Sequence, residues 1–386
     1  MSETASPTLL PEGLRDVLPP DAAAEAALVE LLTASFNANG YDRVSPPLVE
    51  FESTLLAGMG AATADRIFRM VDPISQRTLG IRADVTAQIA RLASTRLQKV
   101  PRPLRLMYAG QVLRVKGHQL RPDRQFTQVG FELIGPDSVA ADAEAIIVAA
   151  QAVADVGVKD LTVDLALPPL VPALLETSEL NEDEIEALYG ALNHKDAAEI
   201  RKLGGSQSDL LCALVEASGP LNVARDSLAR VDLPAAAAEH LKTLFAVADT
   251  VKAETPELAL TIDLVENRGL QYHTGVTFFL FAKGSTREIG RGGRYAVSHG
   301  DKVSEPATGA TLFMDALLPV APKGSVRPCV YTPYGTPRNA ISKLQDDGFR
   351  VRASLTKDAD MLAEARILGC SKMLKDGEVV DVPNER

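Results

Sequence analysis

Hydrophobic residues recur every three to four positions in residues 21–37, which predicts an amphipathic helix. Asp21 can cap its first turn, and Gly40 can end it, because glycine tolerates the left-handed backbone of a helix C-terminus. In residues 104–135 the pattern changes to strand-like runs on either side of a polar stretch rich in Gly, Pro and Arg. This pattern predicts a β-hairpin with a long polar loop.

The following segments divide the chain into a core and an insertion. Residues 140–155 are rich in alanine and predict a helix, and residues 159–167 predict a strand. From 169 to 255 strand patterns disappear, and Ala, Leu and Glu dominate between glycine-containing breaks. We interpret this segment as a helical insertion. Strand-like patterns return in residues 256–322, so we expect these residues and residues 1–168 to form one core.

After Pro319 strand-like and helical patterns alternate again, with helices expected near residues 337–346 and 359–368. This alternation predicts a small α/β unit in residues 323–386. Antiparallel strands and interleaved helices in the remainder of the chain predict an α+β fold.

Composition and charge exclude several classes of function. A chain of 386 residues with 46% hydrophobic and 24% charged residues is typical of a globular protein of two or three domains. The net charge of −11 argues against binding to nucleic acid, which depends on clustered Lys and Arg. No apolar run is long enough to span a membrane, and the N-terminus lacks the pattern of an export signal. We therefore expect a cytoplasmic protein that binds neither nucleic acid nor membranes.

The sequence offers little for metal or cofactor chemistry. The three cysteines, Cys212, Cys329 and Cys370, are widely separated, and the five histidines have no metal-ligand spacing. We expect reduced thiols, no metal and no cofactor. The glycine-rich stretch GRGGRYAV, residues 290–297, lacks the Lys-Ser/Thr pair of a phosphate-binding loop. We attribute its glycines to close backbone approach within a sheet.

Two segments carry candidate binding groups. Asp84 lies where a strand is expected to turn into a helix, and it is either a ligand-binding carboxylate or an ordinary first-turn acid. The polar loop of the predicted hairpin can clamp a phosphate or carboxylate, or it can be a solvated tip. Its charged residues are Arg114, Lys116, His118, Arg121 and Arg124.

The order of these segments resembles that of histidyl-tRNA synthetase, a class II aminoacyl-tRNA synthetase, over roughly residues 10–320. GLRDVLP is similar to its N-terminal signature, and YDRVSPPLVE to motif 1, whose proline (Pro47 here) lies at the family's dimer interface. RADVT stands in place of Arg-Pro-Glu-Gly-Thr, and GQVLRV with RQFTQVGFELIG matches motif 2. RGLQYHTG and GGRY match the histidine-specific segments. The resemblance implies a six- or seven-stranded antiparallel sheet flanked by helices.

The resemblance also implies a pocket for free L-histidine. Asp84 would pair with the amino group, and three aromatic side chains would surround the imidazole, with His273 in place of the family's second tyrosine. Glu132 would line the pocket, although it can also be read as an exposed strand carboxylate. The residues that the resemblance assigns to the pocket are Asp84, Arg114, Gln128, Glu132, Arg268, Tyr272, His273 and Tyr295.

Two departures from the synthetase pattern affect ATP. Lys116 replaces a motif 2 glutamate that helps to hold ATP, and a cation cannot accept the hydrogen bonds of the adenine. Ala316 replaces the motif 3 arginine that neutralises the outer phosphates. We therefore expect that adenylation is lost and that the chain has no catalytic residues. The C-terminal unit is shorter than the synthetase's anticodon-binding domain, and residues 326–386 hold 10 Lys+Arg against 9 Asp+Glu, without a basic stripe.

This combination resembles the regulatory subunits of ATP phosphoribosyltransferase. The resemblance implies a non-catalytic homodimer within a hetero-octamer, which activates a short-form catalytic subunit and contributes to feedback inhibition by histidine. Two alternatives remain. The chain can be a divergent but active histidyl-tRNA synthetase, since Arg114 and Arg268 are retained, or a synthetase-like interaction module with an unrelated partner.

Overall fold

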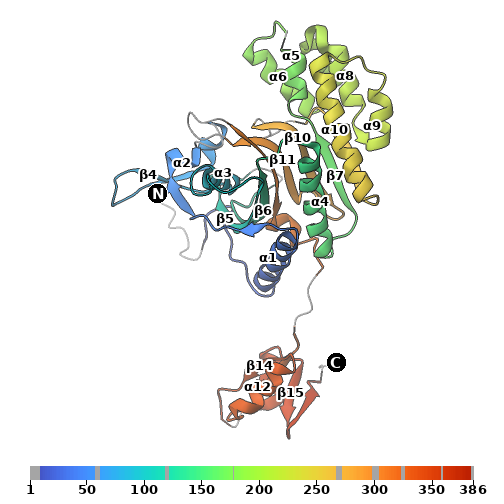
Figure 1. Cartoon of the computed structure of the whole chain (residues 1–386). Coiled ribbons are helices and arrows are strands. Elements are labelled where there is room, and N and C mark those ends of the chain that lie inside the picture. The colour runs from blue at the N-terminus through green and yellow to red at the C-terminus, as the bar shows by residue number, and fades with distance from the viewer. Residues whose placement is uncertain are drawn as a thin grey trace, which may run out of the picture. The chain divides into compact units, whose positions relative to one another are not determined.

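The computed structural model separates the chain into two units, Met1–Pro322 and Lys323–Arg386, and each is described here by itself (Figure 1). The described residues are 9–56, 61–117, 121–176, 178–266, 272–297, 304–322, 327–357 and 360–383. Within them no helix is long and apolar enough to cross a membrane.

The first unit is built on a nine-stranded sheet of order β1-β5-β6-β12-β11-β10-β7-β9-β8. In this order its strands are β1 (Asp42–Arg43), β5 (Leu104–Leu113), β6 (Gln125–Ile134), β12 (Glu305–Phe313), β11 (Gly290–Val297), β10 (His273–Ala282), β7 (Leu161–Ala166), β9 (Ala259–Asp263) and β8 (Gly219–Pro220). Neighbours from β5 to β7 are antiparallel, whereas β1 is parallel to β5 and β7 is parallel to β9. The α+β class is confirmed, and the sheet extends beyond its antiparallel centre through these parallel pairs.

The predicted hairpin is present as β5 and β6, whose ten-residue strands pair from Leu104↔Ile134 to Leu113↔Gln125. A second, three-stranded sheet of order β2-β4-β3 precedes it in the chain. This small sheet and its neighbouring helices comprise β2 (Val49–Phe51), α2 (Glu52–Leu56), a 3-10 helix (Ala61–Arg66), β3 (Phe68–Val71), β4 (Thr78–Ile81) and α3 (Thr86–Ser94).

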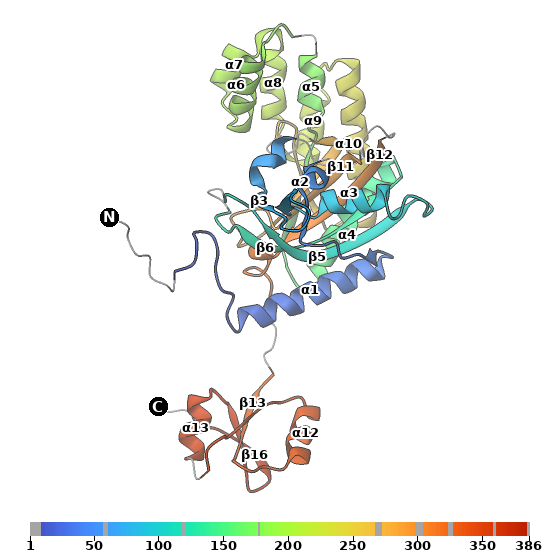
Figure 2. The same ribbon diagram turned by 90° about the vertical axis from the view of Figure 1, so that its left-hand side faces the viewer.

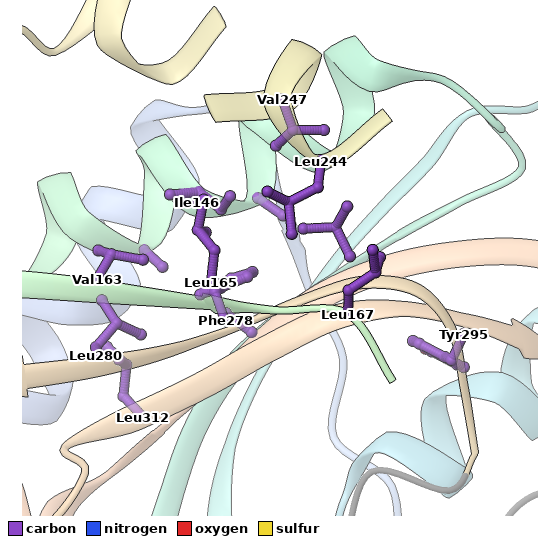
Figure 3. Packing of buried hydrophobic residues seen from close by; sticks show 14 of the residues in the cluster. Ile146, Val163, Leu165, Leu167, Leu244, Val247, Phe278, Leu280, Tyr295 and Leu312 are labelled. Atoms are coloured by element: carbon purple, nitrogen blue, oxygen red, sulfur yellow. The ribbon is translucent and has the colours of Figure 1, made fainter. Parts of the chain in front are cut away.

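Helices α1 (Asp21–Ala38), α4 (Val139–Asp155) and α10 (Ala235–Glu254) bury their apolar side chains against the sheet. Figure 3 shows Ile146 of α4 and Leu244 of α10 packed over Leu165 of β7 and Phe278 of β10. The expectation that Asp21 caps α1 is wrong, because the helix begins at Asp21 itself, after Pro20, and has no side-chain cap. Asp21 is instead a first-turn acid, which the helix dipole favours.

A helical segment separates β7 from β9, as the loss of strand patterns predicted. It comprises α5 (Leu170–Leu175), α6 (Glu182–Asn193), α7 (Ala197–Leu203), a 3-10 helix (Gly205–Gln207), α8 (Ser208–Glu216), α9 (Leu221–Leu228) and α10. Figures 1 and 2 show α5 to α8 gathered beyond one end of the sheet, from which α10 runs back beside α4. The two-residue strand β8 interrupts these helices and pairs with β9. It is too short to leave an alternating pattern in the sequence.

The second unit is a four-stranded sheet of order β14-β13-β15-β16 with two helices. Its elements are β13 (Cys329–Thr332), α12 (Arg338–Asp346), β14 (Arg350–Ala353), α13 (Met361–Ile367), β15 (Lys372–Lys375) and β16 (Glu378–Asp381). Strand β13 is parallel to both β14 and β15, and β15 and β16 form an antiparallel hairpin.

Candidate functional site

A small pocket, partly open to solvent, lies on the sheet where β6, β10, β11 and β12 meet the start of α3. Five of the residues that the resemblance assigned to a ligand pocket line it. The full lining is Asp84, Thr86, Glu132, Tyr272, His273, Arg291, Gly292, Gly293, Tyr295, Gly309, Ala310, Thr311 and Phe313.

Asp84 lies in the turn between β4 and α3, and both of its carboxylate oxygens are held. Oδ1 accepts a hydrogen bond from the Thr86 backbone N–H (2.9 Å), and Oδ2 accepts one from Gln128 Nε2 (2.8 Å). Gln128 is fully buried, and its Oε1 accepts from the Val85 backbone N–H (3.1 Å), which leaves its amide group to face Asp84. Gln128 is not among the lining residues, so it orients Asp84 from behind. Helix α3 begins at Thr86 and has no acid in its first turn, so the reading of Asp84 as a first-turn acid is wrong. Asp84 instead stabilises the turn before the helix and also faces the pocket.

Glu132 is a buried carboxyl on β6, only 2% exposed, so its reading as an exposed strand carboxylate is wrong. Its Oε2 accepts a hydrogen bond from the Tyr295 hydroxyl (2.9 Å). The residue opposite on β12 is Gly309, where a Cβ would lie 2.1 Å from Oε2, so glycine makes room for the carboxyl group. Burial is the main cause that raises the pKa of Glu132 to about 8; the hydrogen bonds that it accepts lower the pKa, and the nearby charge of Asp84 raises it. Glu132 therefore favours its protonated form more strongly than an exposed carboxyl does.

Three hydroxyl groups adjoin these carboxyls. The buried Tyr108 of β5 lies with its hydroxyl 2.6 Å from Thr311 Oγ1 and 3.4 Å from Thr86 Oγ1. These three hydroxyl groups connect the start of α3 to β12 through Tyr108, because a hydroxyl group can both donate and accept a hydrogen bond. No local pattern in the sequence marks Tyr108 or Thr311 as site residues, because only the register of β5, β6 and β12 brings them beside the site.

An aromatic wall faces the carboxyl groups. The rings of Tyr272 and His273 lie 4.0 Å apart, and those of Tyr272 and Tyr295 lie 6.2 Å apart at 72°. His273 and Tyr295 are cross-strand partners on β10 and β11. Tyr272 is 37% exposed, whereas His273 and Tyr295 are buried, so Tyr272 lies at the mouth of the pocket. This arrangement suits a flat ring.

Arginine residues supply positive charge at the site. Arg291 on β11 lines the pocket. It was not among the expected site residues, because the glycines of residues 290–297 were the only feature considered in that strand. Arg114 follows β5; its Nε donates to the Ala83 carbonyl (3.4 Å), and its guanidinium lies 4.9 Å from the Phe126 ring. Burial, and then the charge of Arg291, lower the pKa of Arg114 to about 10. Arg114 is close to the pocket but is not a lining residue, and Arg268 lies outside the described residues.

Within the polar hairpin loop, Arg121 is not part of a solvated tip but is buried against the chain. Arg121 is 3% exposed, and its guanidinium lies 3.8 Å from the Phe313 ring. Its Nε is 3.6 Å from Asp315 Oδ2, which also lies 3.2 Å from Arg287 Nη2. The loop's arginine therefore neutralises a carboxylate of the chain itself, at the start of α11 (Met314–Leu317). His118 of this loop lies outside the described residues.

Of the two positions that departed from the synthetase pattern, Ala316 is next to Asp315 in the chain. It lies in α11 and is 2% exposed. Lys116 follows β5 and is exposed. Arg121 and Arg287 are thus the cations that meet the motif 3 region, and both are paired with Asp315.

Comparisons with known proteins agree with this architecture. The histidyl-tRNA synthetase family model matches residues 13–317. A protein from Paramagnetospirillum magneticum, described as an ATP phosphoribosyltransferase regulatory subunit, is 48% identical over 382 residues, which cover 99% of this chain and 100% of the relative. The crystal structure of an ATP phosphoribosyltransferase regulatory subunit/histidyl-tRNA synthetase from Bacillus halodurans is similar with a TM-score of 0.81 and 25% identity, covering 95% of this chain and 97% of that one. A chain of an ATP phosphoribosyl transferase complex from Thermotoga maritima shares the fold, with a TM-score of 0.58 and 19% identity over 75% of this chain and 97% of that one.

Proposed function

The chain belongs to the family of ATP phosphoribosyltransferase regulatory subunits, and we propose that it acts in histidine biosynthesis as a non-catalytic subunit that senses L-histidine. In this proposal it binds a short-form catalytic subunit, activates it, and transmits feedback inhibition by histidine. Its homodimer is the unit from which the hetero-octamer is built.

The pocket is the observation that carries the histidine-binding part of this proposal. Free histidine presents an ammonium group, a carboxylate and a flat imidazole. Asp84 is the oriented acceptor for the ammonium group, and the rings of Tyr272 and Tyr295 fit the imidazole. Arg291 supplies the positive charge that the ligand's carboxylate requires, together with Arg114 and Arg268 as the sequence resemblance implies.

Co-purification tests the assembly. The tagged chain should retain an untagged short-form catalytic subunit, and the pair should have higher phosphoribosyltransferase activity than the catalytic subunit alone. L-histidine should inhibit the pair. The proposal fails if the two chains elute separately and the activity of the catalytic subunit does not change when this chain is added.

Loss of adenylation leads to a separate prediction. Ala316→Arg alone should show no histidine-dependent ATP–pyrophosphate exchange, because Lys116 remains at the adenine side and the groups of such a site act as a unit. Ala316 is 2% exposed, so the circular dichroism of the variant must first show that it is folded. Lys116→Glu, at an exposed position, is the companion variant and should also be inactive. Exchange in either single variant, or in the wild type, would favour the active-synthetase alternative.

We also predict that the isolated chain is a dimer through the motif 1 region. Leu31 on α1 and Leu48 next to Pro47 are 55% and 46% exposed in the single chain, so a second copy that covers the motif 1 region would remove their apolar surface from water. Light scattering at micromolar concentration should report twice the chain mass, and Leu48→Asp should shift the equilibrium toward monomer. A wild-type chain that scatters as a monomer would contradict this prediction.

A further inference from the structure

Two of the three cysteines meet in the core of the second unit. Cys329 begins β13 and Cys370 lies between α13 and β15, 41 positions later in the chain. Because β13 and β15 are neighbours with Val330 opposite Lys372, the two cysteines come together, and their Sγ atoms are 2.8 Å apart. The two cysteines are far apart in the sequence but adjacent in the fold.

The geometry places both sulfurs close to bonding distance. A disulfide has an S–S length of about 2.05 Å, so the two Sγ atoms need to approach by less than ~1 Å. Both side chains are buried, at 9% and 4% exposure, and lie on adjacent parts of one small sheet. Each thiol therefore meets the other before it meets a thiol from another molecule.

The size of the unit gives such a bond a structural consequence. The buried cluster of this unit holds Cys329, Tyr331, Ala365, Cys370 and Met373, and partly buried residues surround it. A core of this size provides limited stability, and natural domains of similar length often add a covalent link. A bond across 41 positions closes a long loop and so restricts the unfolded unit strongly.

We propose that Cys329 and Cys370 form a reversible disulfide in response to a peroxide-class oxidant, and that this bond fastens the C-terminal unit. One thiolate attacks hydrogen peroxide, which gives a sulfenic acid and, after protonation, water. The second thiol then attacks the sulfenic sulfur, the S–S bond forms, and a second water leaves. Two thiols are oxidised by two electrons in total, and one peroxide is reduced to two waters. Both cysteines belong to the second unit, whereas the residues that line the histidine pocket belong to the first.

The same burial sets the rate of the reaction. Burial, followed by the hydrogen bond with Cys329, raises the pKa of Cys370 to about 12, and the thiolate is the reactive form. Oxidation is therefore slow in the closed unit and proceeds when the unit opens transiently. A dithiol reductant restores both thiols by exchange.

Peptide mapping of the full-length chain tests the proposal. The reduced chain is exposed to hydrogen peroxide, unfolded, alkylated and digested, with and without dithiothreitol. The expected product is an intramolecular link between the Cys329 and Cys370 peptides that dithiothreitol removes. Thermolysin should cleave the linked C-terminal unit at least about tenfold more slowly than the reduced one.

The third cysteine provides the matched control. Cys212 is buried in the large core of the first unit, where its Sγ contacts the Ala197 carbonyl at 3.7 Å. Cys212→Ser should form the link as the wild type does, whereas Cys329→Ser and Cys370→Ser should not. Three results would overturn the proposal. The first is sulfinic or sulfonic acid in place of the link, and the second is a link between separate chains. The third is that both thiols remain alkylatable although hydrogen exchange shows that β13 opened during exposure to the oxidant.

Discussion

Replacing Asp84 with asparagine is expected to weaken the binding of free L-histidine by roughly 10²- to 10⁴-fold. Breaking a buried charge pair by removing one partner typically costs about 3–5 kcal/mol. The geometry adds to this cost. Gln128 Nε2 donates to Asp84 Oδ2, and Gln128 Oε1 already accepts a hydrogen bond from the Val85 N–H. An asparagine amide nitrogen in place of Oδ2 would therefore put one N–H donor against the N–H donor of Gln128.

The control for this variant makes the same chemical change at a distant, exposed residue. Asp160 directly precedes β7. Its neighbour Leu161 pairs with Ala282, at the other end of β10 from the pocket residue His273, so Asp160 is distant from the pocket. Its φ is +52°, a conformation that asparagine tolerates well, so Asp160→Asn should leave the fold and the binding of histidine unchanged.

Calorimetry on the wild type and both variants, alone and with the catalytic subunit, measures the effect. Histidinol, which has the amine and the ring but no carboxylate, should bind less tightly than histidine if an arginine meets the carboxylate. Unchanged histidine affinity and inhibition in Asp84→Asn would mean that the pocket is vestigial and that feedback histidine binds elsewhere, such as the interface between subunits.

Glu132→Gln is expected to stabilise the ligand-free chain at alkaline pH and to leave it almost unchanged near pH 5. Burial raises the pKa of this carboxyl from its ordinary range to about 8, so the folded state holds the proton longer than the unfolded state does. The stability from this group is fully present below its ordinary pKa of about 4.5 and is lost as pH rises through about 8. Above that pH the gain from glutamine should approach about 5 kcal/mol, since the pKa is raised from 4.5 to about 8 and each pKa unit corresponds to about 1.4 kcal/mol. Urea unfolding near both pH values measures the difference.

Glu144 provides a control of opposite sign. It forms a two-point ion pair with Arg105, at 2.9 and 2.8 Å, and that hydrogen bonding holds its pKa below the ordinary value. Glu144→Gln should therefore destabilise the chain at neutral pH, and the effect should fade as the pH falls through the folded-state pKa. A Glu132→Gln variant that loses stability at neutral pH, as is expected of Glu144→Gln, would contradict the raised pKa of Glu132.

The protonated state of Glu132 also affects ligand binding. A cationic ligand beside it favours the ionised carboxylate, so binding of histidine at neutral pH should release a proton and should strengthen as pH rises toward about 8. Calorimetry in buffers of different ionisation enthalpy detects this proton, and Glu132→Gln should abolish the release.

Local patterns in the sequence were sufficient to predict the β5–β6 hairpin, the helical segment and the α+β class, because each depends on the periodicity of neighbouring residues. The synthetase-like fold is confirmed by the family match. The order of the motifs predicted that Asp84, Glu132 and Tyr295 share one pocket, and all three line it in the structure. The remaining features depend on pairing between distant segments.

Arg291 and Thr311, for example, face each other only through the register of β11 and β12. Neither residue is distinctive in its own segment. The contact between Cys329 and Cys370 likewise depends on the parallel pairing of β13 and β15, and the strand β8 is defined only by its neighbour β9. Register of this kind is set by tertiary packing, which local propensity does not contain.

The pairing of β6 with β12 has a consequence for synthesis on the ribosome. It joins Gln128–Ile134 with Ala307–Phe313, so the two walls of the pocket emerge at widely different times. Asp84 and Glu132 leave the ribosome first, but neither can meet Tyr295 until almost the whole first unit has been made. If histidine binds as proposed, it cannot guide early folding, because only the completed sheet contains its pocket. Until then one edge of β6 is open to pairing with other chains, so the nascent protein depends on fast closure or on chaperones to avoid aggregation.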